Sequence, residues 1–506
     1  MTGTVAVLVR PGPDLAALGR TLASLHRQGR GPWRAVVAGA GLTAADRAAV
    51  TRGARSVTWT DAAWDGPAHT VLAAGLDATD ATWVGVLGQG DEVEPGVLPA
   101  LVEYLAARPA VDVLYTDDQW AAAGSDGIQT KPDWVPSYLE GWDYLGRLCL
   151  VRRPLADGAF GPATAGAEEW DLHLRATERA AVVEHVPVLG VTRAAPPAGD
   201  PATVEAGRRA VERRYERLGV DATVEVAHPD GFLRVWRALP DPPPLVSVVV
   251  PTGGGVREVR GESTLLVETC LRSLVDRTTY DSWELVLVPS EGTPDSVVDV
   301  AREVVGDRLV VAPVTGEFSF SHSVNEGVRA ARGDLVLLLN DDTEVLEPRW
   351  LERMVSVAQD PTVGVVGAKL LFEDRSIQHV GIVHDDSWLP VHAFRGAPDD
   401  TGNFGARVVD MDFLVVTGAC LLTRRDLYVE VGGFSPELPM AFNDVDFCHK
   451  VGATGLRVVC TPFATLHHHE SATRVADVRP WERAYLVERT LSLAAHDPYV
   501  NHRSVR

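Results

Sequence analysis

The sequence contains one pattern twice, and this repeat limits the fold more than any other feature. VAVLV near the N-terminus and VSVVV after residue 245 each precede a helical segment and a second apolar run, WRAVVAG in one copy and WELVLVP in the other. Further along, TWVGVLGQGDEVEP corresponds to DLVLLLNDDTEVLEP, and EEWD corresponds to NDVD. The period is far too long for a solenoid. We interpret the chain as two tandem copies of one α/β unit.

Strand-like and helix-like segments alternate in the second copy. Short β-branched runs, such as Leu245 to Val250 and Trp283 to Val288, predict buried strands, and SHSVNEGVRAAR predicts a helix between two of them. This alternation predicts a largely parallel sheet, in which ligands bind at the carboxyl ends of the strands. The predicted fold class is therefore α/β, with two tandem Rossmann-like domains.

Prolines mark the boundary between the copies. The segment LPDPPPL, Leu239 to Leu245, favours a stiff and extended backbone. We predict a first domain over residues 1–238, a proline-rich linker over 239–245, a second domain over 246–475 and a helical tail over 476–506.

Charge and cysteine content narrow the class of protein. Sixty-nine acidic residues against 47 basic ones give a formal net charge of −22, which argues against nucleic acid as a partner. The five cysteines form no CxxC pair and are typical of reduced thiols. No apolar stretch reaches the roughly 18 residues that span a bilayer. We expect a cytoplasmic protein, with peripheral contact at the inner face of the cell membrane allowed.

The first group of candidate site residues is Asn340-Asp341-Asp342, directly after the strand-like run DLVLLL. Two carboxylates at the carboxyl end of a strand suit a hard divalent cation that also contacts a diphosphate. The same residue types form turns and cap helices, so a structural role is an open alternative.

The second group lies at the start of a predicted helix, where Asn443 or Asp444 is expected at the N-cap. A carboxylate there stays ionised and can serve as a general base, although a plain cap explains the residues equally well. Only one of Asp444 and Asp446 should face a substrate, because residues i and i+2 do not share a helix face.

The third group is His467-His468-His469, expected after a short strand, RVVC, and a loop, TPFATL. Adjacent histidines cannot easily all bind one ion, so one or two at most are ligands, and a solvated loop is the alternative. A zinc site lacks further Cys or His at ligand spacing. Together, a metal-binding acid, a base and a metal-binding histidine follow one another along a single α/β unit.

These motifs resemble a known family. The second half is similar to bacterial family 2 glycosyltransferases of the rhamnosyltransferase-like type, which have the GT-A fold. The matching stretches are VSVVVPT, FSFSHSVNEGVRAARGDLVLLLNDDTEV, IQHVGIV, VVTGACLLTRRDLYVEVGGF, AFNDVDFCHK, LHHHESATR and HDPYVN. The first half resembles the same family through YTDDQW, KPDWVPSYLEGWDYLG and EEWDLHLRATERA.

The resemblance implies an activity and its residues. It implies transfer of a sugar, with inversion, from a nucleotide-diphosphate sugar to an acceptor hydroxyl on a glycan or a lipid-linked molecule, in cell-envelope or surface polysaccharide synthesis. At the DxD position, Asp342 would bind Mg²⁺ or Mn²⁺ with Asp341 beside it. His468 would be the metal histidine, with His469 as its alternative, and Asp444 the catalytic base.

The resemblance also implies a binding pocket. Pro251, Thr252, Asn340 and Asp341 would contact the donor, and Thr417, Gly418 and Asn443 would line the pocket for the sugar and the acceptor.

The sequence departs from the family in two places. Pro289 or Ser290 stands where the family has the aspartate that reads the nucleotide base. The first copy has Gly88-Gln89-Gly90 at the DxD position, Glu169 in place of the base and no matching histidine, so we expect it to be non-catalytic.

These departures motivate two other hypotheses. One is a non-catalytic protein that binds a glycan or a partner, although such a protein has no need of Asp342, Asp444 and His468 together. The other is a nucleotidyltransferase, which would need basic residues near the first strand, where the sequence offers only Arg257 and Arg260.

Overall fold

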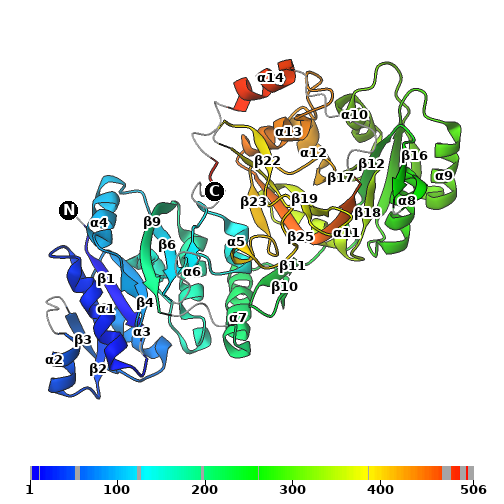
Figure 1. Ribbon diagram of the computed structural model, residues 1–506. Coiled ribbons are helices and arrows are strands. Elements are labelled where there is room, and N and C mark those ends of the chain that lie inside the picture. Colours follow the sequence, from blue (N-terminus) through cyan, green and yellow to red (C-terminus); the bar gives the residue numbers. More distant parts are fainter. Residues whose placement is uncertain are drawn as a thin grey trace. The chain divides into compact units, whose positions relative to one another are not determined.

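The protein is described here by a computed structural model, in which the chain divides into two compact units. The first lies within Met1–Val235 and the second within Trp236–Tyr499. Figure 1 shows the ribbon of both. The structure describes residues 3–10, 12–51, 57–121, 127–194, 199–259, 261–385, 387–469, 480–490 and 497–499.

The first unit is built on one mixed sheet with the strand order β3-β2-β1-β4-β8-β6-β9-β5, and β7 pairs with β6. Its strands are β1 (Val5–Arg10), β2 (Trp33–Ala40), β3 (Val57–Ala63), β4 (Trp83–Gly88), β5 (Glu92–Val93), β6 (Val113–Trp120), β7 (Ile128–Gln129), β8 (Leu150–Arg152) and β9 (Val183–Arg193). Its helices are α1 (Leu15–Arg27), α2 (Ala44–Val50), α3 (Ala68–Asp77), α4 (Val97–Ala107), α5 (Pro136–Gly141), α6 (Glu168–Arg179) and α7 (Pro201–Leu218). A separate two-stranded sheet follows, β10 (Ala222–Val226) with β11 (Leu233–Arg237).

The sheet of the second unit has the order β16-β15-β12-β17-β24-β19-β25-β18, with β20 on β19 and β23 on β25. Its strands are β12 (Val246–Thr252), β15 (Trp283–Pro289), β16 (Leu309–Val311), β17 (Leu335–Leu339), β18 (Thr343–Val345), β19 (Val363–Leu371), β20 (Ile377–His379), β23 (Met411–Phe413), β24 (Cys420–Arg424) and β25 (Arg457–His468). The helices are α8 (Leu266–Arg277), α9 (Asp295–Val305), α10 (Phe320–Ala330), α11 (Trp350–Ala358), α12 (Arg425–Glu430), α13 (Asn443–Gly452) and α14 (Pro480–Thr490). Two hairpins lie beside it, β13 (Val256–Val259) with β14 (Glu262–Leu265), and β21 (Ile382–His384) with β22 (Pro390–His392).

The two sheets share one order of eight strands, and β23 is an additional strand of the second sheet. In both orders, the first four strands run parallel, and the next strand, β8 or β24, is antiparallel to its neighbour. The prediction of an α/β fold with two tandem units is therefore confirmed. Beyond the fourth strand the sheets are mixed, because β6 and β9, like β19 and β25, pair in parallel while their other neighbours are antiparallel.

Burial on both faces explains the apolar runs of the second unit. All seven residues of β12 are buried, and the strand lies between β15 and β17, both parallel to it. Such a strand needs no alternation of polar and apolar residues. Helix α10 packs closely on it, because a Cβ at Gly327 would collide with Val249 and Val288. Ser319 begins that helix by accepting a hydrogen bond from the backbone N–H of His322, at 3.2 Å.

The boundary between the units falls after Val235, three residues before the end of the predicted first domain. Arg237 already belongs to the second unit, where its backbone N–H donates to Ser356 at 2.8 Å. The proline-rich stretch also belongs to that unit, and the hydroxyl of Tyr280 donates to the carbonyl of Pro244 at 2.6 Å. Of the predicted helical tail, the structure describes α14 and residues 497–499, and the remainder lies outside the described residues.

Candidate active site

The central strands of the second sheet bring the predicted donor-binding residues together at their carboxyl ends. The hydroxyl of Thr252, the last residue of β12, donates to Oδ2 of Asp341 at 2.6 Å and accepts from the N–H of Gly254 at 3.0 Å. Asp341 is thereby directed toward β12. The backbone N–H of Asn340 donates to Ala419 at 3.0 Å, which fixes the turn after β17 beside the start of β24.

Asp342 and His468 form the pair that most resembles a metal site. Strands β18 and β25 pair antiparallel, with Thr343 opposite His468, and this pairing places Oδ1 of Asp342 3.1 Å from Nε2 of His468. Oδ1 is buried and accepts no hydrogen bond from a described residue.

This pair fits a divalent ion. Two adjacent ligands of an octahedral ion, each about 2.1 Å from it, lie about 3 Å apart, which is the separation of these two atoms. No cluster of three or more His, Cys, Asp or Glu side chains suited to a metal occurs among the described residues. Asp342 and His468 would be two ligands of such an ion, and a diphosphate and water commonly complete the coordination of Mg²⁺ at phosphate sites.

Strand β25 separates the three histidines. It runs unbroken through His468, so the loop predicted over TPFATL is wrong: these residues continue the strand, with a register shift opposite Ala368 and Lys369. Side chains alternate along a strand, and His467 and His469 accordingly share the opposite face, with ring centres 6.2 Å apart. Nδ1 of His469 lies 3.1 Å from Glu373, so the structure pairs His468, and not His469, with Asp342.

Asp444 lies in the first turn of α13. The expected N-cap is wrong, because Phe442 holds that position in a left-handed conformation with φ of 59°, and Asn443 and Asp444 are the first two helical residues. Both still lie at the positive end of the helix. Oδ2 of Asp444 accepts from the N–H of Gly418 at 2.9 Å, so the segment of Thr417 and Gly418 contacts the candidate base directly.

Asp446 is engaged elsewhere. Its carboxylate accepts from Ser435 at 2.6 Å and forms ion pairs with Lys450 at 3.1 Å and Arg489 at 2.8 Å. The side chain is buried, whereas Asp444 is partly exposed. Of the two aspartates, Asp444 is therefore the one open to a substrate.

The pocket residues include polar atoms that no described residue satisfies. Nδ2 of Asn443, Oδ1 of Asn340 and the hydroxyl of Ser290 are buried and have no hydrogen-bond partner in the described part of the chain. Buried polar atoms are normally paired, so atoms of this kind are suited to bind a ligand. Ser290 is one residue after Pro289, which is paired with Thr252 at the end of β15.

Sequence reasoning assigned no role to several residues that support this site. Helix α14 holds the chain before α13, because Glu482 accepts from the N–H groups of Met440 and Ala441, both at 3.2 Å. His379 is fully buried on β20, and its Nε2 lies 3.4 Å from the N–H of Thr417. In the sequence, His379 and Gln378 stand out only as part of the motif IQHVGIV, and the motif does not predict which residues they contact.

The carboxyl edge of the first sheet carries different side chains. Asp91, after β4, accepts from the N–H groups of Gly88 at 2.7 Å and Ala194 at 3.0 Å. Arg147, in the segment before β8, lies 2.9 Å from Asp91 and forms a second ion pair with Glu169. Burial lowers the pKa of Arg147 to about 10, which still leaves the guanidinium charged at neutral pH.

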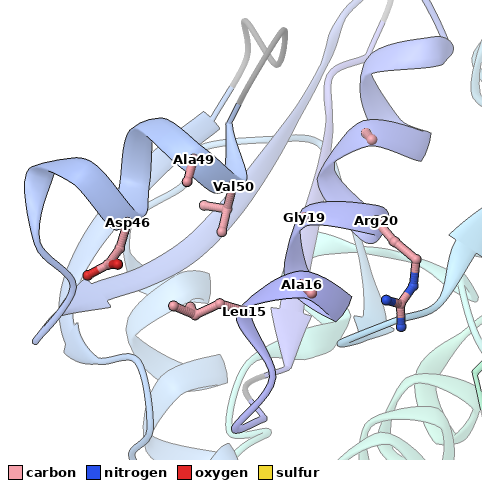
Figure 2. Close-up of a pocket in the computed structure, with 8 residues that line it drawn as sticks. Leu15, Ala16, Gly19, Arg20, Asp46, Ala49 and Val50 are labelled. Atoms are coloured by element: carbon pink, nitrogen blue, oxygen red, sulfur yellow. The ribbon is translucent and has the colours of Figure 1, made fainter.

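Gln89, at the position of the DxD motif in the first unit, lines a small cavity. Gln89 donates a hydrogen bond to the carbonyl of Asp14. The cavity that Gln89 lines with Arg10 and Trp64 has a volume of about 10 Å³, near the minimum that one water molecule needs. A larger groove of about 450 Å³ lies between α1 and α2 (Figure 2), and none of its lining residues is a predicted site residue; they are Leu15, Ala16, Gly19, Arg20, Ala23, Asp46, Ala49 and Val50.

Comparison with known proteins assigns the second unit to a family. Residues 242–487 match the family described as glycosyltransferase like family 2. This part of the chain belongs to that family, as the resemblance implied.

Two curated relatives extend the similarity to more of the chain. The O-antigen biosynthesis protein RfbC of Myxococcus xanthus is 32% identical over 512 residues, covering 97% of this chain and 39% of the relative. The uncharacterized protein y4gI of Sinorhizobium fredii is 32% identical over 428 residues, covering 81% of this chain and 46% of the relative. The chain thus spans less than half the length of either relative.

Among solved structures, the mannosyltransferase PcManGT from Pyrobaculum calidifontis, in complex with GDP-Man and Mn²⁺, aligns with a TM-score of 0.36 and 20% identity, over 52% of this chain and 69% of that chain. Agreement this loose carries no argument about the donor or the metal of this chain. Within the described residues, no helix combines the length and the apolar character needed to cross a membrane.

Proposed function

We propose that the chain is an inverting, metal-dependent glycosyltransferase whose second unit transfers a sugar from a nucleotide-diphosphate sugar to an acceptor hydroxyl. The observation that supports it most is the pairing of Asp342 with His468 at the carboxyl edge of a family 2 domain, where a buried carboxylate oxygen and an imidazole nitrogen lie 3.1 Å apart.

Asp342 and His468 are the residues that would hold Mg²⁺ or Mn²⁺. A divalent ion there would stabilise the charge that develops on the departing diphosphate. Asp341, directed toward Thr252, supports the turn after β17 from the other side. Pro251, Thr252 and Asn340 lie at the same edge and are proposed to contact the donor.

Asp444 is the proposed general base. Its Oδ2 accepts a hydrogen bond from Gly418, and its position in the first turn of α13 favours the ionised form. An ionised carboxylate can withdraw the proton of the acceptor hydroxyl during in-line attack, which inverts the configuration at the sugar carbon. Thr417, Gly418 and Asn443 surround this carboxylate and are proposed to line the acceptor pocket.

The first unit is proposed to be non-catalytic. At the position of the base, Glu169 is paired with Arg147, and the cavity that Gln89 lines has a volume of only about 10 Å³. These observations support the alternative in which that half of the chain binds a glycan or a partner.

The acceptor is proposed to be a glycan or a lipid-linked precursor of a surface polysaccharide, in the cytoplasm or at the inner face of the membrane. The name of the Myxococcus xanthus relative supports this pathway.

Calorimetric titration of the purified chain with UDP, GDP and dTDP, each with and without Mn²⁺, tests the proposal. Binding of one nucleotide only when Mn²⁺ is present would support an active transferase and identify its donor class. Failure of all three to bind the folded protein would favour the non-catalytic alternative for the whole chain.

A further inference from the structure

Gln378 makes two contacts with the proposed metal histidine. It is a buried residue of β20, 90 positions before His468 in the chain. Its Nε2 donates to the backbone carbonyl of His468 at 3.1 Å, and its Oε1 lies 2.7 Å from Nδ1 of the His468 ring. One side chain therefore contacts both the backbone and the ring of the same histidine.

The first contact fixes the orientation of the amide. A backbone carbonyl only accepts hydrogen bonds, so the NH₂ group of Gln378 must face it. The amide oxygen is then the atom that faces the ring, and an amide oxygen is also only an acceptor. Nδ1 of His468 must therefore carry the proton of this 2.7 Å hydrogen bond.

This hydrogen bond determines what Nε2 can do. In a neutral imidazole with the proton on Nδ1, Nε2 has a free lone pair. Nε2 lies 3.1 Å from a carboxylate oxygen of Asp342 and 3.3 Å from Nδ2 of Asn340. An amide NH₂ and an unprotonated nitrogen are complementary, whereas the nitrogen and the carboxylate oxygen both carry lone pairs and attract the same cation.

We infer that Gln378 is a positioning residue that holds His468 in the Nδ1–H tautomer and thereby prepares Nε2 to bind a metal ion beside Asp342. Hydrogen bonds of this kind orient histidine ligands and raise their basicity, and losing one typically costs 10- to 100-fold in metal affinity. The tautomer follows from the contacts alone, and the effect on metal binding rests on the proposed function.

The tautomer can be measured without metal or donor. In the full chain with ¹⁵N-labelled histidine, at about pH 8, where an ordinary imidazole is neutral, NMR distinguishes a protonated from an unprotonated ring nitrogen. The His468 signals are identified by their absence in His468→Gln. We expect the proton on Nδ1 in the wild-type chain and its loss from that position in Gln378→Leu. A proton on Nε2 in the wild-type chain would overturn the inference.

Metal affinity provides the second measurement, by titration of the free chain with Mn²⁺ followed by electron paramagnetic resonance. Gln378→Leu removes the acceptor and is expected to lower the affinity about 10- to 100-fold. Gln378→Glu keeps an acceptor for Nδ1–H but loses the donor to the carbonyl of His468, so it should retain more of the affinity than Gln378→Leu does. Gln359→Leu is the matched control, because the side chain of Gln359 donates to the carbonyl of Val355, four residues before it on α11.

The two measurements separate the inference from the proposed function. The Nδ1–H tautomer together with no Mn²⁺ binding by the wild-type chain would refute the metal-dependent function and leave the role of Gln378 in the tautomer intact. Equal Mn²⁺ affinity in the wild type and a folded Gln378→Leu chain would instead overturn the role of Gln378 in metal binding.

Discussion

The two sheets have the same strand order, but the carboxylates at their carboxyl edges have different partners. In the second unit, Asp342 faces a histidine nitrogen at 3.1 Å and has a buried oxygen without a hydrogen bond from any described residue. In the first unit, both oxygens of Asp91 accept backbone hydrogen bonds, and Arg147 pairs with Asp91 and Glu169. One edge keeps a carboxylate oxygen without a hydrogen bond from a described residue, and the other pairs its carboxylates with an arginine.

This difference shows how one strand order can carry two kinds of edge. A buried carboxylate without a partner destabilises a protein, so the buried Asp91 and Glu169 need a positive charge nearby. Arg147 meets that need from the segment before β8, the position from which Gly418 contacts Asp444 in the second unit. We expect the arginine to stabilise the first unit, and it lies beside Glu169, which corresponds to Asp444 of the second unit.

The largest expected effect is on turnover. Asp444→Asn keeps the size of the side chain but removes the proposed base, and we expect turnover to fall by about 10²- to 10⁴-fold with donor binding nearly unchanged. Initial rates and calorimetric donor binding measure the two quantities. Glu169→Gln, at the corresponding position of the first unit, should leave turnover unchanged. Full activity of Asp444→Asn would place the base elsewhere.

The next effect is on metal-dependent donor binding. Asp342→Ala removes a proposed ligand of the metal. We therefore expect the factor by which Mn²⁺ increases the affinity for the donor nucleotide to be at least about 100-fold smaller than in the wild type. Calorimetry with and without Mn²⁺ measures this ratio. Asp91→Asn in the first unit is the control and should not change it. An unaltered metal dependence in Asp342→Ala would remove Asp342 from the site.

A third effect concerns the stability of the first unit. Arg147→Ala leaves the buried Asp91 without its counter-charge and leaves Glu169 with the more distant Arg10, at 3.7 Å, and we expect it to lower the free energy of unfolding by about 4 kcal/mol, with the transfer rate unchanged. Urea denaturation measures the loss. Arg27→Ala breaks an exposed pair with Glu92 and should cost less than about 1 kcal/mol. An equal cost for both variants would show that the Arg147 pairs contribute little.

The smallest expected effect is on the pH dependence of stability, to which a buried histidine contributes in each unit. In the second unit, burial and the neighbouring His384 lower the pKa of His449 to about 4. In the first, burial alone would lower the pKa of His173, but Asp143, 2.8 Å away, raises it to about 10. His449 is therefore neutral in the folded state at pH values where an unfolded histidine is protonated, and His173 is charged where an unfolded one is neutral.

The two histidines should act in opposite directions. The contribution of His449 to stability is present above pH 6.5 and decreases as the pH falls toward 4, by about 1 to 2 kcal/mol between pH 6.5 and about 5. The contribution of His173 is present below pH 6.5 and decreases toward pH 10, by a similar amount between pH 6.5 and about 8. Urea denaturation of His449→Gln and His173→Gln across this range measures both, with the exposed His322→Gln as the control. If both substitutions changed the pH dependence of the free energy of unfolding in the same direction, this assignment would be contradicted.

Much of the fold and the approximate place of the site were predictable from the sequence. The apolar runs of β12, β15 and β17 are buried on both faces, so their hydrophobicity identifies them without knowledge of their neighbours. Because parallel strands end at one edge, the residues after β12 and β17 had to meet, and Thr252 does contact Asp341.

The sequence could not choose among adjacent residues with the same chemistry. Which of three consecutive histidines faces Asp342 depends on β25 continuing through the stretch predicted as a loop, and on the alternation of its side chains. Likewise, Phe442 takes the N-cap position with a left-handed backbone, so Asn443 and Asp444 lie inside the helix. Phenylalanine has no local preference for this conformation, so the sequence did not predict it.

The sequence by itself determined the repeat, the order of strands and helices, and the set of acids and histidines from which a site could be built, because these depend on periodic patterns of neighbouring residues. Only the tertiary structure decided that Gln378 holds His468, that Arg147 neutralises Glu169, and that Asp446 is engaged by Arg489 while Asp444 is left partly exposed. These contacts join residues far apart in the chain. Their geometry is set by how strands pair and helices pack, which the residues nearby in sequence do not specify.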